Sequence, residues 1–195
     1  LTTGPAGRRE WDAENRLVAI TYADNTQTRL RYDGSSRLRE VAEYGPSTNL
    51  TNTVRYAWNG MLPWAELDGT NRILRTFTWG LDLSSSVGGA GGIGGLVGVR
   101  SCPGTGTNYL VRTDAKGNVT EIRQTNGTVV ATYGYAPFGN IITNTGTYAQ
   151  PFRFQTKMCH ARSDLGYWAF RWYDYKTGRW ISRDGLGEAG GINLY

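Results

Sequence analysis

RWYDYKTGRWISRDGLGEAGGINLY, residues 171–195, is the stretch from which the fold can be worked out. Its first residues alternate aromatic and polar side chains, Lys176-Thr177-Gly178 is typical of a tight turn, and Trp180 with Ile181 starts a second apolar run. The segment after Ser182 is rich in glycine, which disfavours a helix. The stretch therefore predicts an antiparallel β-hairpin that delivers a loop.

The composition extends this reading to the whole chain. The 195 residues include 27 glycines, 12 tyrosines and 7 tryptophans but only 2 methionines, a mixture that suits short strands joined by tight turns. No run approaches the roughly 20 apolar residues needed to cross a bilayer, so no membrane span is expected. The first residues have no initiator Met and no signal peptide, and we expect the chain to be a piece of a longer polypeptide.

An internal repeat gives the strands an order. WDAENRL at 11–17 and YDGSSRL at 32–38 share the pattern aromatic, Asp, three residues, Arg, Leu, and the two copies are 21 residues apart. Apolar residues alternate between the copies, so each repeat is interpreted as a β-hairpin. DAKGNV at 114–119 is a degenerate third copy. We interpret Asp12, Asp33 and Asp114 as turn residues whose carboxylates accept backbone N–H groups.

The net charge of +5 raises the question of a nucleic-acid partner. The basic residues are scattered singly at strand-like spacing, which favours the solvent-facing sides of strands over a track for phosphates. The residues concerned are Arg29, Arg31, Arg37, Arg39, Arg55, Arg72 and Arg75. No nucleic-acid partner is expected.

The sequence offers little for a metal or a cofactor, and none is expected. Cys102 and Cys159 are 57 residues apart and are interpreted as two unpaired thiols, with a disulfide as the alternative. His160 next to Cys159 lacks the further ligands that zinc requires. The glycine-rich run 84–99 has no Gly-Lys-Ser/Thr and is interpreted as close-packed, buried, irregular backbone.

The repeats resemble RHS or YD repeats, and residues 171–195 resemble the signature of the RHS repeat-associated core domain; Tyr135-Ala136-Pro137-Phe138-Gly139 also fits that family. The resemblance implies an all-β fold of spiralling antiparallel β-hairpins that form part of a β-shell or cage. It also implies two parts, with repeat hairpins over 1–150 and a core segment over 151–195.

The same resemblance implies a chemistry, because the family's core domain is similar to an intramolecular aspartic protease that cuts the chain downstream of an Asp-x-x-Gly motif. Carried over, the candidate catalytic pair is Asp184, which begins that motif, and Asp174, with Arg171 and Arg179 as supporting residues. Two nearby carboxylates can share a proton and so divide acid and base roles. The family usually has proline where this chain has Tyr175 and Gly185. The alternative is that both aspartates only cap turns.

Three functions remain open at this point. The first is a structural shell of the polymorphic-toxin type that encapsulates and presents a C-terminal effector domain. The second adds release of that domain by self-cleavage, with no independent turnover. The third is a cell-surface module that binds glycans or proteins through exposed aromatic side chains. The expected partners are the effector domain and upstream repeats of the same polypeptide, with an oligomer or a secretion apparatus as further candidates, and the expected location is secreted or at the cell surface.

Overall fold

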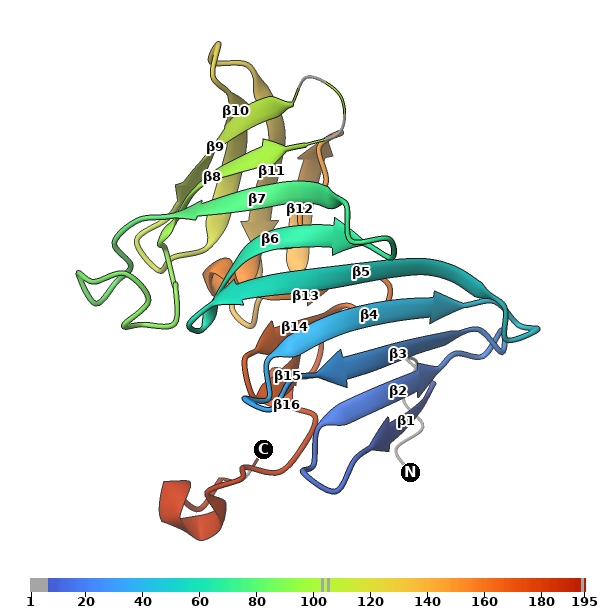
Figure 1. The fold of residues 1–195 in the computed structure, drawn as a ribbon. Coiled ribbons are helices and arrows are strands. Elements are labelled where there is room, and N and C mark those ends of the chain that lie inside the picture. The colour runs from blue at the N-terminus through green and yellow to red at the C-terminus, as the bar shows by residue number, and fades with distance from the viewer. Residues whose placement is uncertain (1–6, 103, 105, 194) are drawn as a thin grey trace.

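The computed structural model describes residues 7–102, 104, 106–193 and 195, which form two antiparallel sheets (Figure 1). The larger sheet contains β1 (Arg8–Trp11), β2 (Leu17–Thr21), β3 (Gln27–Tyr32), β4 (Leu38–Tyr44), β5 (Leu50–Asn59), β6 (Leu62–Asp68), β7 (Ile73–Trp79), β8 (Leu96–Ser101), β9 (Thr107–Thr113), β10 (Val119–Gln124), β11 (Val129–Tyr135) and β12 (Ile141–Gly146). The smaller sheet contains β13 (Met158–His160), β14 (Leu165–Trp168), β15 (Arg171–Asp174) and β16 (Arg179–Trp180).

Both sheets are meanders in which each strand pairs with the next one along the chain. This confirms the predicted all-β fold of successive antiparallel hairpins. The helical elements within the described residues are two short 3₁₀ turns, η1 (Phe154–Thr156) and η2 (Gly187–Gly190). In that part of the chain, no helix has the length and apolar character to span a membrane.

The hairpin ends explain why the large sheet curves. The register shifts by a β-bulge at an aromatic residue at or next to the end of β1, β3, β5, β7 and β11, namely Trp11, Tyr32, Trp58, Trp79 and Tyr135, which we call the corner aromatics. A bulge bends its strand and increases the local twist. These five bulges lie at the same end of odd-numbered strands and, together with bulges at other strand ends such as that at Tyr44, they accompany the curl of the sheet into a partial shell. Trp11 and Tyr32 therefore occupy equivalent corners, as the repeat predicts.

The smaller sheet, hereafter the inner sheet, lies against the concave face of this shell (Figure 1). Hydrogen bonds between distant segments hold it there. Leu38 N donates to Tyr167 Oη at 2.9 Å, Tyr167 Oη lies 3.0 Å from Ser36 O, and Trp172 Nε1 donates to Tyr32 Oη at 2.8 Å. The buried side chains of both sheets form one hydrophobic core, so the inner sheet packs into the hollow that the curvature creates.

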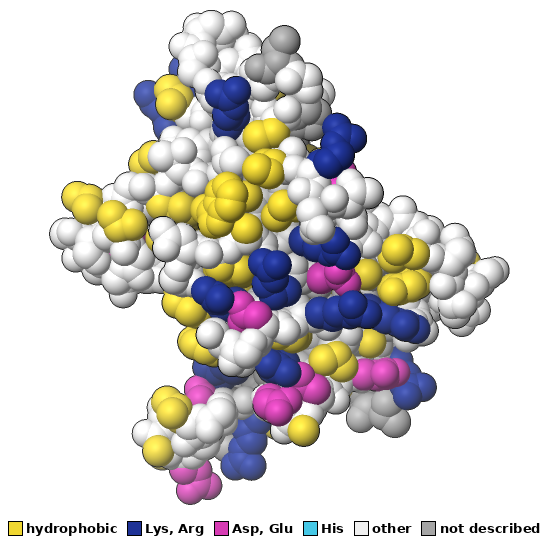
Figure 2. Space-filling model, in the orientation of Figure 1, with side chains coloured by type: hydrophobic (Ala, Val, Ile, Leu, Met, Phe, Trp, Pro, Cys, Tyr) yellow, Lys and Arg dark blue, Asp and Glu magenta, His cyan; other side chains and the backbone are white. Residues whose placement is uncertain are grey.

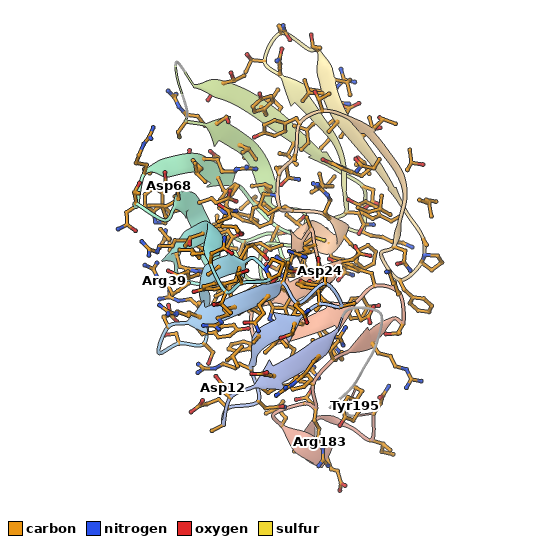
Figure 3. All side chains as sticks on the ribbon, turned by 90° about the vertical axis from the view of Figure 1, so that its right-hand side faces the viewer. Asp12, Asp24, Arg39, Asp68, Arg183 and Tyr195 are labelled. Carbon is orange, nitrogen blue, oxygen red and sulfur yellow. The ribbon has the colours of Figure 1, made fainter. Side chains whose placement is uncertain are left out.

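The outer face of the shell carries charged side chains of both signs, which Figure 2 shows interleaved. Glu40 accepts from Arg55 at 2.8 Å and lies 3.5 Å from Arg31. The expectation of solvent-facing arginines is wrong for Arg75, whose side chain points into the shell and pairs with buried Glu66 at 3.2 Å. Arg75 is in phase with the inward-facing Phe77, a signal that the alternation of β7 already contains.

The glycine-rich segment between β7 and β8 is folded around one carboxylate. Asp82 accepts hydrogen bonds from Ala90 N at 2.8 Å and Gly92 N at 3.0 Å. Gly92 is buried, and a Cβ there would lie 2.8 Å from the Trp79 ring, so close packing requires the glycine. The predicted buried backbone is confirmed at Gly92, whereas residues 83–87 are exposed.

Candidate functional site

The repeated aspartates are turn residues, as predicted from the sequence. Asp12 accepts from Arg16 N at 2.9 Å and from Arg16 Nε at 2.7 Å, and Asp33 accepts from Arg37 N at 3.0 Å and Arg37 Nε at 2.8 Å. Asp114 closes the same turn with Asn118 in place of arginine. Burial alone would raise the pKa of Asp12 and Asp33, but these hydrogen bonds outweigh it and lower both pKa values.

The corner aromatics form a second repeated contact that sequence reasoning missed. Four of them donate to a backbone carbonyl of the preceding hairpin: Tyr32 Oη to Leu17 O at 2.6 Å, Trp58 Nε1 to Leu38 O at 2.8 Å, Trp79 Nε1 to Pro63 O at 2.7 Å, and Tyr135 Oη to Val119 O at 2.7 Å. Each acceptor is the residue that pairs across the preceding hairpin end. A signal existed, since each corner carries Tyr or Trp, the aromatic residues with a hydrogen-bond donor.

Trp11 is the exception at the start of the shell. Its Nε1 is buried and has no hydrogen-bond partner within the described residues, and the same is true of Arg9 Nε on the same strand. β1 is also an edge strand of the large sheet. In the four bonds above, the acceptor lies 15 to 20 residues before the aromatic donor.

The terminal hairpin brings together one predicted pair of site residues. Arg171 Nη2 lies 2.8 Å from Asp184 Oδ2, and the Arg171 guanidinium stacks 4.3 Å above the Trp180 ring. Asp184 Oδ1 accepts from Leu186 N at 2.9 Å and so also caps a turn. The side chain of Arg171 is 22% exposed and that of Asp184 is 25% exposed, so residues after Asp184 can reach this pair.

Asp174 is not joined to Asp184. It lies at the far end of β15 from Arg171, three residues or about 10 Å along the strand. Its Oδ1 accepts from Lys176 N at 2.9 Å and its Oδ2 lies 3.9 Å from Arg9 Nη2. Arg179 faces Asp174 in the β15–β16 register and is exposed. Asp174 and Arg179 thus belong to the turn of the hairpin.

Tyr175, at a position where the resemblance noted in the sequence implies proline, is a core residue. It is 2% exposed and packs edge-on against Phe154, with ring centroids 6.1 Å apart. Its backbone carbonyl accepts from Asn140 Nδ2 at 2.7 Å. The side chain therefore fixes the hairpin against the end of the large sheet by packing rather than by a restricted φ angle.

A groove of about 720 Å³ separates the concave face of the large sheet from the loop before β13 and the start of the inner sheet. Its lining includes the ion pair of Glu66 with Arg75 at 3.2 Å and the hydrogen bond between Glu43 and His160 at 2.8 Å. Burial raises the pKa of Glu66, and Arg75 only partly offsets this. Burial also disfavours charge on Glu43, but hydrogen bonds from His160 and Thr28 outweigh it and lower the pKa of that carboxyl.

The described residues give no group of three or more His, Cys, Asp or Glu side chains placed to hold a metal ion. Cys102 and Cys159 are both free, as expected from their spacing. Burial raises the pKa of the Cys159 thiol to about 12, so it is an unreactive core residue.

Comparisons with known proteins agree with this repeat architecture. Residues 11–57 match the family model of the RHS repeat, and residues 99–188 match that of the teneurin YD-shell. Double-stranded DNA deaminase toxin A of Burkholderia cenocepacia (strain H111) is 26% identical over 208 residues, which is 96% of this chain but 14% of that protein.

Solved structures share the fold. A crystal structure of TcdB2-TccC3 aligns with a TM-score of 0.71 and 21% identity over 97% of this chain and 10% of that chain. A structure of the Photorhabdus luminescens Tc holotoxin pore aligns with a TM-score of 0.71 and 17% identity over 100% of this chain and 9% of that chain. The chain thus corresponds to a small part of these proteins.

Proposed function

Because the chain is an RHS/YD-repeat protein, we propose that it is a segment of a toxin-associated β-shell whose concave side, in the complete polypeptide, encloses a C-terminal effector domain. Repeat hairpins up to about residue 150 would form the wall, and residues 151–195 would form the core segment that packs inside it. The curved sheet supports the role of residues up to about 150 as a wall, and the packing of the inner sheet on its concave face supports the role of the core segment. The sequence similarity to a deaminase toxin supports an association with toxins and a secreted or cell-surface location.

The observation that carries the proposal is the unsatisfied start of the shell. Among the described residues, the buried Trp11 Nε1 has no carbonyl of the kind that the other four corner aromatics bind in the preceding hairpin. A buried unpaired donor costs about 1–3 kcal/mol, so one more hairpin of the same type before β1 would be stabilising. An open strand edge also invites pairing, with upstream repeats in the complete polypeptide or with a second copy in the isolated chain.

The test compares Trp11→Phe in the 195-residue chain and in a chain extended by its native upstream sequence. In the short chain the substitution removes a donor that is already unpaired, so the cost is one of packing. In the extended chain it also breaks a hydrogen bond, and we expect about 1 kcal/mol of additional destabilisation in urea unfolding. Trp58→Phe is the matched control, because its partner Leu38 is present in both chains and its cost should be equal. An equal cost of Trp11→Phe in both chains would count against the continuing shell.

Enclosure is tested separately with the polypeptide extended through its native downstream domain. An enclosed domain should resist a protease that degrades the same domain expressed alone. Cleavage at equal rates in the two preparations would reject encapsulation and leave the shell architecture intact.

Self-cleavage is the second candidate, and the Arg171–Asp184 pair favours it. The guanidinium holds the carboxylate where the chain leaves the inner sheet, so Asp184 is the residue we assign to the chemistry. Asp174 has a similar side-chain exposure of 18% and a turn role, which makes Asp174→Asn the matched control. In the downstream-extended polypeptide, Asp184→Asn should abolish cleavage seen by mass spectrometry. An uncut wild-type chain would refute the activity.

The glycan-binding alternative receives less support. Its stacking surface requires exposed aromatic rings, and Trp64, Phe138 and Phe170 are exposed, whereas most of the large aromatic side chains contribute to the core, among them Tyr56, Tyr133, Tyr167, Trp172 and Tyr175. The aromatic residues of this chain serve mainly to pack the two sheets together.

A further inference from the structure

A small hollow of about 80 Å³ lies at the rim of the shell, between the β5–β6 turn, the glycine-rich segment and the inner sheet. Its walls are mainly apolar, and five of the side chains that line it are aromatic: Trp58, Trp79, Phe152, Tyr167 and Trp168. The hydroxyl of Tyr167 is engaged by Leu38 N, and burial raises its pKa, so it remains a neutral phenol. The hollow therefore has the apolar walls with few polar groups that are typical of small-molecule sites.

Lys157 is the one charged side chain among the described residues that line this hollow. Its Nζ donates to Gly91 O at 2.6 Å. The acidic group whose field reaches it is Asp82, and that carboxylate is occupied by the N–H groups of Ala90 and Gly92. Burial lowers the pKa of the Lys157 ammonium to about 8, with Asp82 opposing the shift. The amine is thus held beside aromatic walls without a directly paired carboxylate.

We propose that Lys157 is the nucleophile of a covalent binding site for a small aldehyde that carries a planar aromatic ring. The lone pair of the neutral Nζ attacks the carbonyl carbon, and the C=O π electrons pass to the oxygen, which is protonated. Loss of water from this carbinolamine leaves a C=N bond, and both protons of the neutral amine leave in that water. The step is reversible and needs no oxidant or reductant.

The aromatic side chains that line the hollow favour a ligand with an aromatic ring. Flat aromatic faces at stacking or edge distance favour a planar ligand, and each such contact adds to the free energy of burial. An enclosed apolar cavity of about 150 Å³ holds a whole benzene molecule. A hollow of 80 Å³ that opens to solvent therefore accommodates one ring inserted part of the way, with its carbonyl at Lys157.

The chain provides its own internal controls, since its three lysines are Lys116, Lys157 and Lys176, and the other two are exposed. The 195-residue chain is treated with limiting benzaldehyde at pH 7.5, the imine is trapped with cyanoborohydride, and the lysine-containing peptides are quantified by mass spectrometry. At this pH about a quarter of an amine with a pKa of about 8 is neutral, against about 0.1% of an ordinary exposed lysine. We expect at least tenfold faster labelling of Lys157.

A second arm separates binding from simple amine reactivity. Propanal replaces benzaldehyde, and the ratio of the two labelling rates is compared among the three lysines. The aromatic walls predict a benzaldehyde preference that is several times larger at Lys157 than at Lys116. Lys157→Arg should remove the fast adduct while the variant keeps the far-UV spectrum of the wild type. Even labelling of the three lysines, or an equal preference at Lys157 and Lys116, would overturn the proposal.

Discussion

Removing one hydroxyl, with Tyr32→Phe, tests whether the corner aromatics hold the shell together. Tyr32 Oη donates to Leu17 O at 2.6 Å in the preceding hairpin and accepts from Trp172 Nε1 at 2.8 Å in the inner sheet. The phenol therefore joins three elements: β2, its own strand β3, and β15. Phenylalanine keeps the ring and removes only this junction.

The expected cost follows from the two groups left behind. Trp172 is 4% exposed and Leu17 is 2% exposed, so water does not readily replace the lost partner. A buried donor or acceptor left unpaired costs about 1–3 kcal/mol, and two of them give about 2–4 kcal/mol after allowance for partial relaxation. For a chain of this size, that corresponds to a fall in Tm of roughly 5–15 °C.

Urea unfolding followed by tryptophan fluorescence measures this loss. The midpoint should fall while the slope with urea stays constant, because the surface exposed on unfolding does not change. Tyr44→Phe is the matched control, since the Tyr44 ring packs under the Arg29 guanidinium at 4.6 Å and phenylalanine keeps that ring; its cost should stay within about 0.5 kcal/mol. If Tyr32→Phe costs no more than Tyr44→Phe, the junction does not stabilise the shell.

Three further variants probe the buried charges. The pKa of Glu66 is raised in the folded protein, so the stability that this carboxyl contributes is complete below its unfolded pKa of about 4.3 and is lost as the pH rises through the folded pKa. Glu66→Gln keeps a hydrogen-bond partner for Arg75 but does not titrate. In thermal melts between pH 4 and pH 7, this variant should therefore gain stability relative to the wild type. Glu43 has a lowered pKa, so the opposite sign holds: Glu43→Gln should destabilise the protein at pH 7, where its bond to His160 is lost, and cost little once the pH has fallen through the folded pKa. Asp82→Ala should release the glycine-rich segment, and limited proteolysis should then cut within residues 83–92 much faster than in wild type.

The local features of the fold could be predicted because residues close together in the sequence determine them. The pattern aromatic, Asp, three residues, Arg, Leu contains the turn, its carboxylate cap and the arginine that binds it, all within seven residues. The alternation between the copies then defines the strands. The capping role of Asp12 and Asp33 could therefore be assigned before any coordinates.

Features that depend on distant contacts could not be predicted in this way. Nothing near Tyr167 in the sequence indicates that its hydroxyl binds Leu38, 129 residues away, or that residues 158–180 leave the large sheet to form their own. The prediction that Asp174 and Asp184 form a pair depends on the same kind of information. Ten residues separate Asp174 from Asp184 along the chain, but the hairpin register places them at opposite ends of β15.

The corner aromatics explain how one motif serves both the wall and its filling. Each of the five bulges turns a Tyr or Trp inward, where its apolar ring packs against the core, and at every corner except Trp11 the polar atom bonds the preceding hairpin. The Tyr32 hydroxyl also accepts a hydrogen bond from Trp172 in the inner sheet. Tyr167 of the inner sheet bonds the backbone N–H of Leu38, close to the same corner. The inner sheet therefore docks in one register, because Trp172 must meet the Tyr32 hydroxyl and Tyr167 must meet Leu38 N, and an apolar segment in its place would leave Leu38 N without this partner.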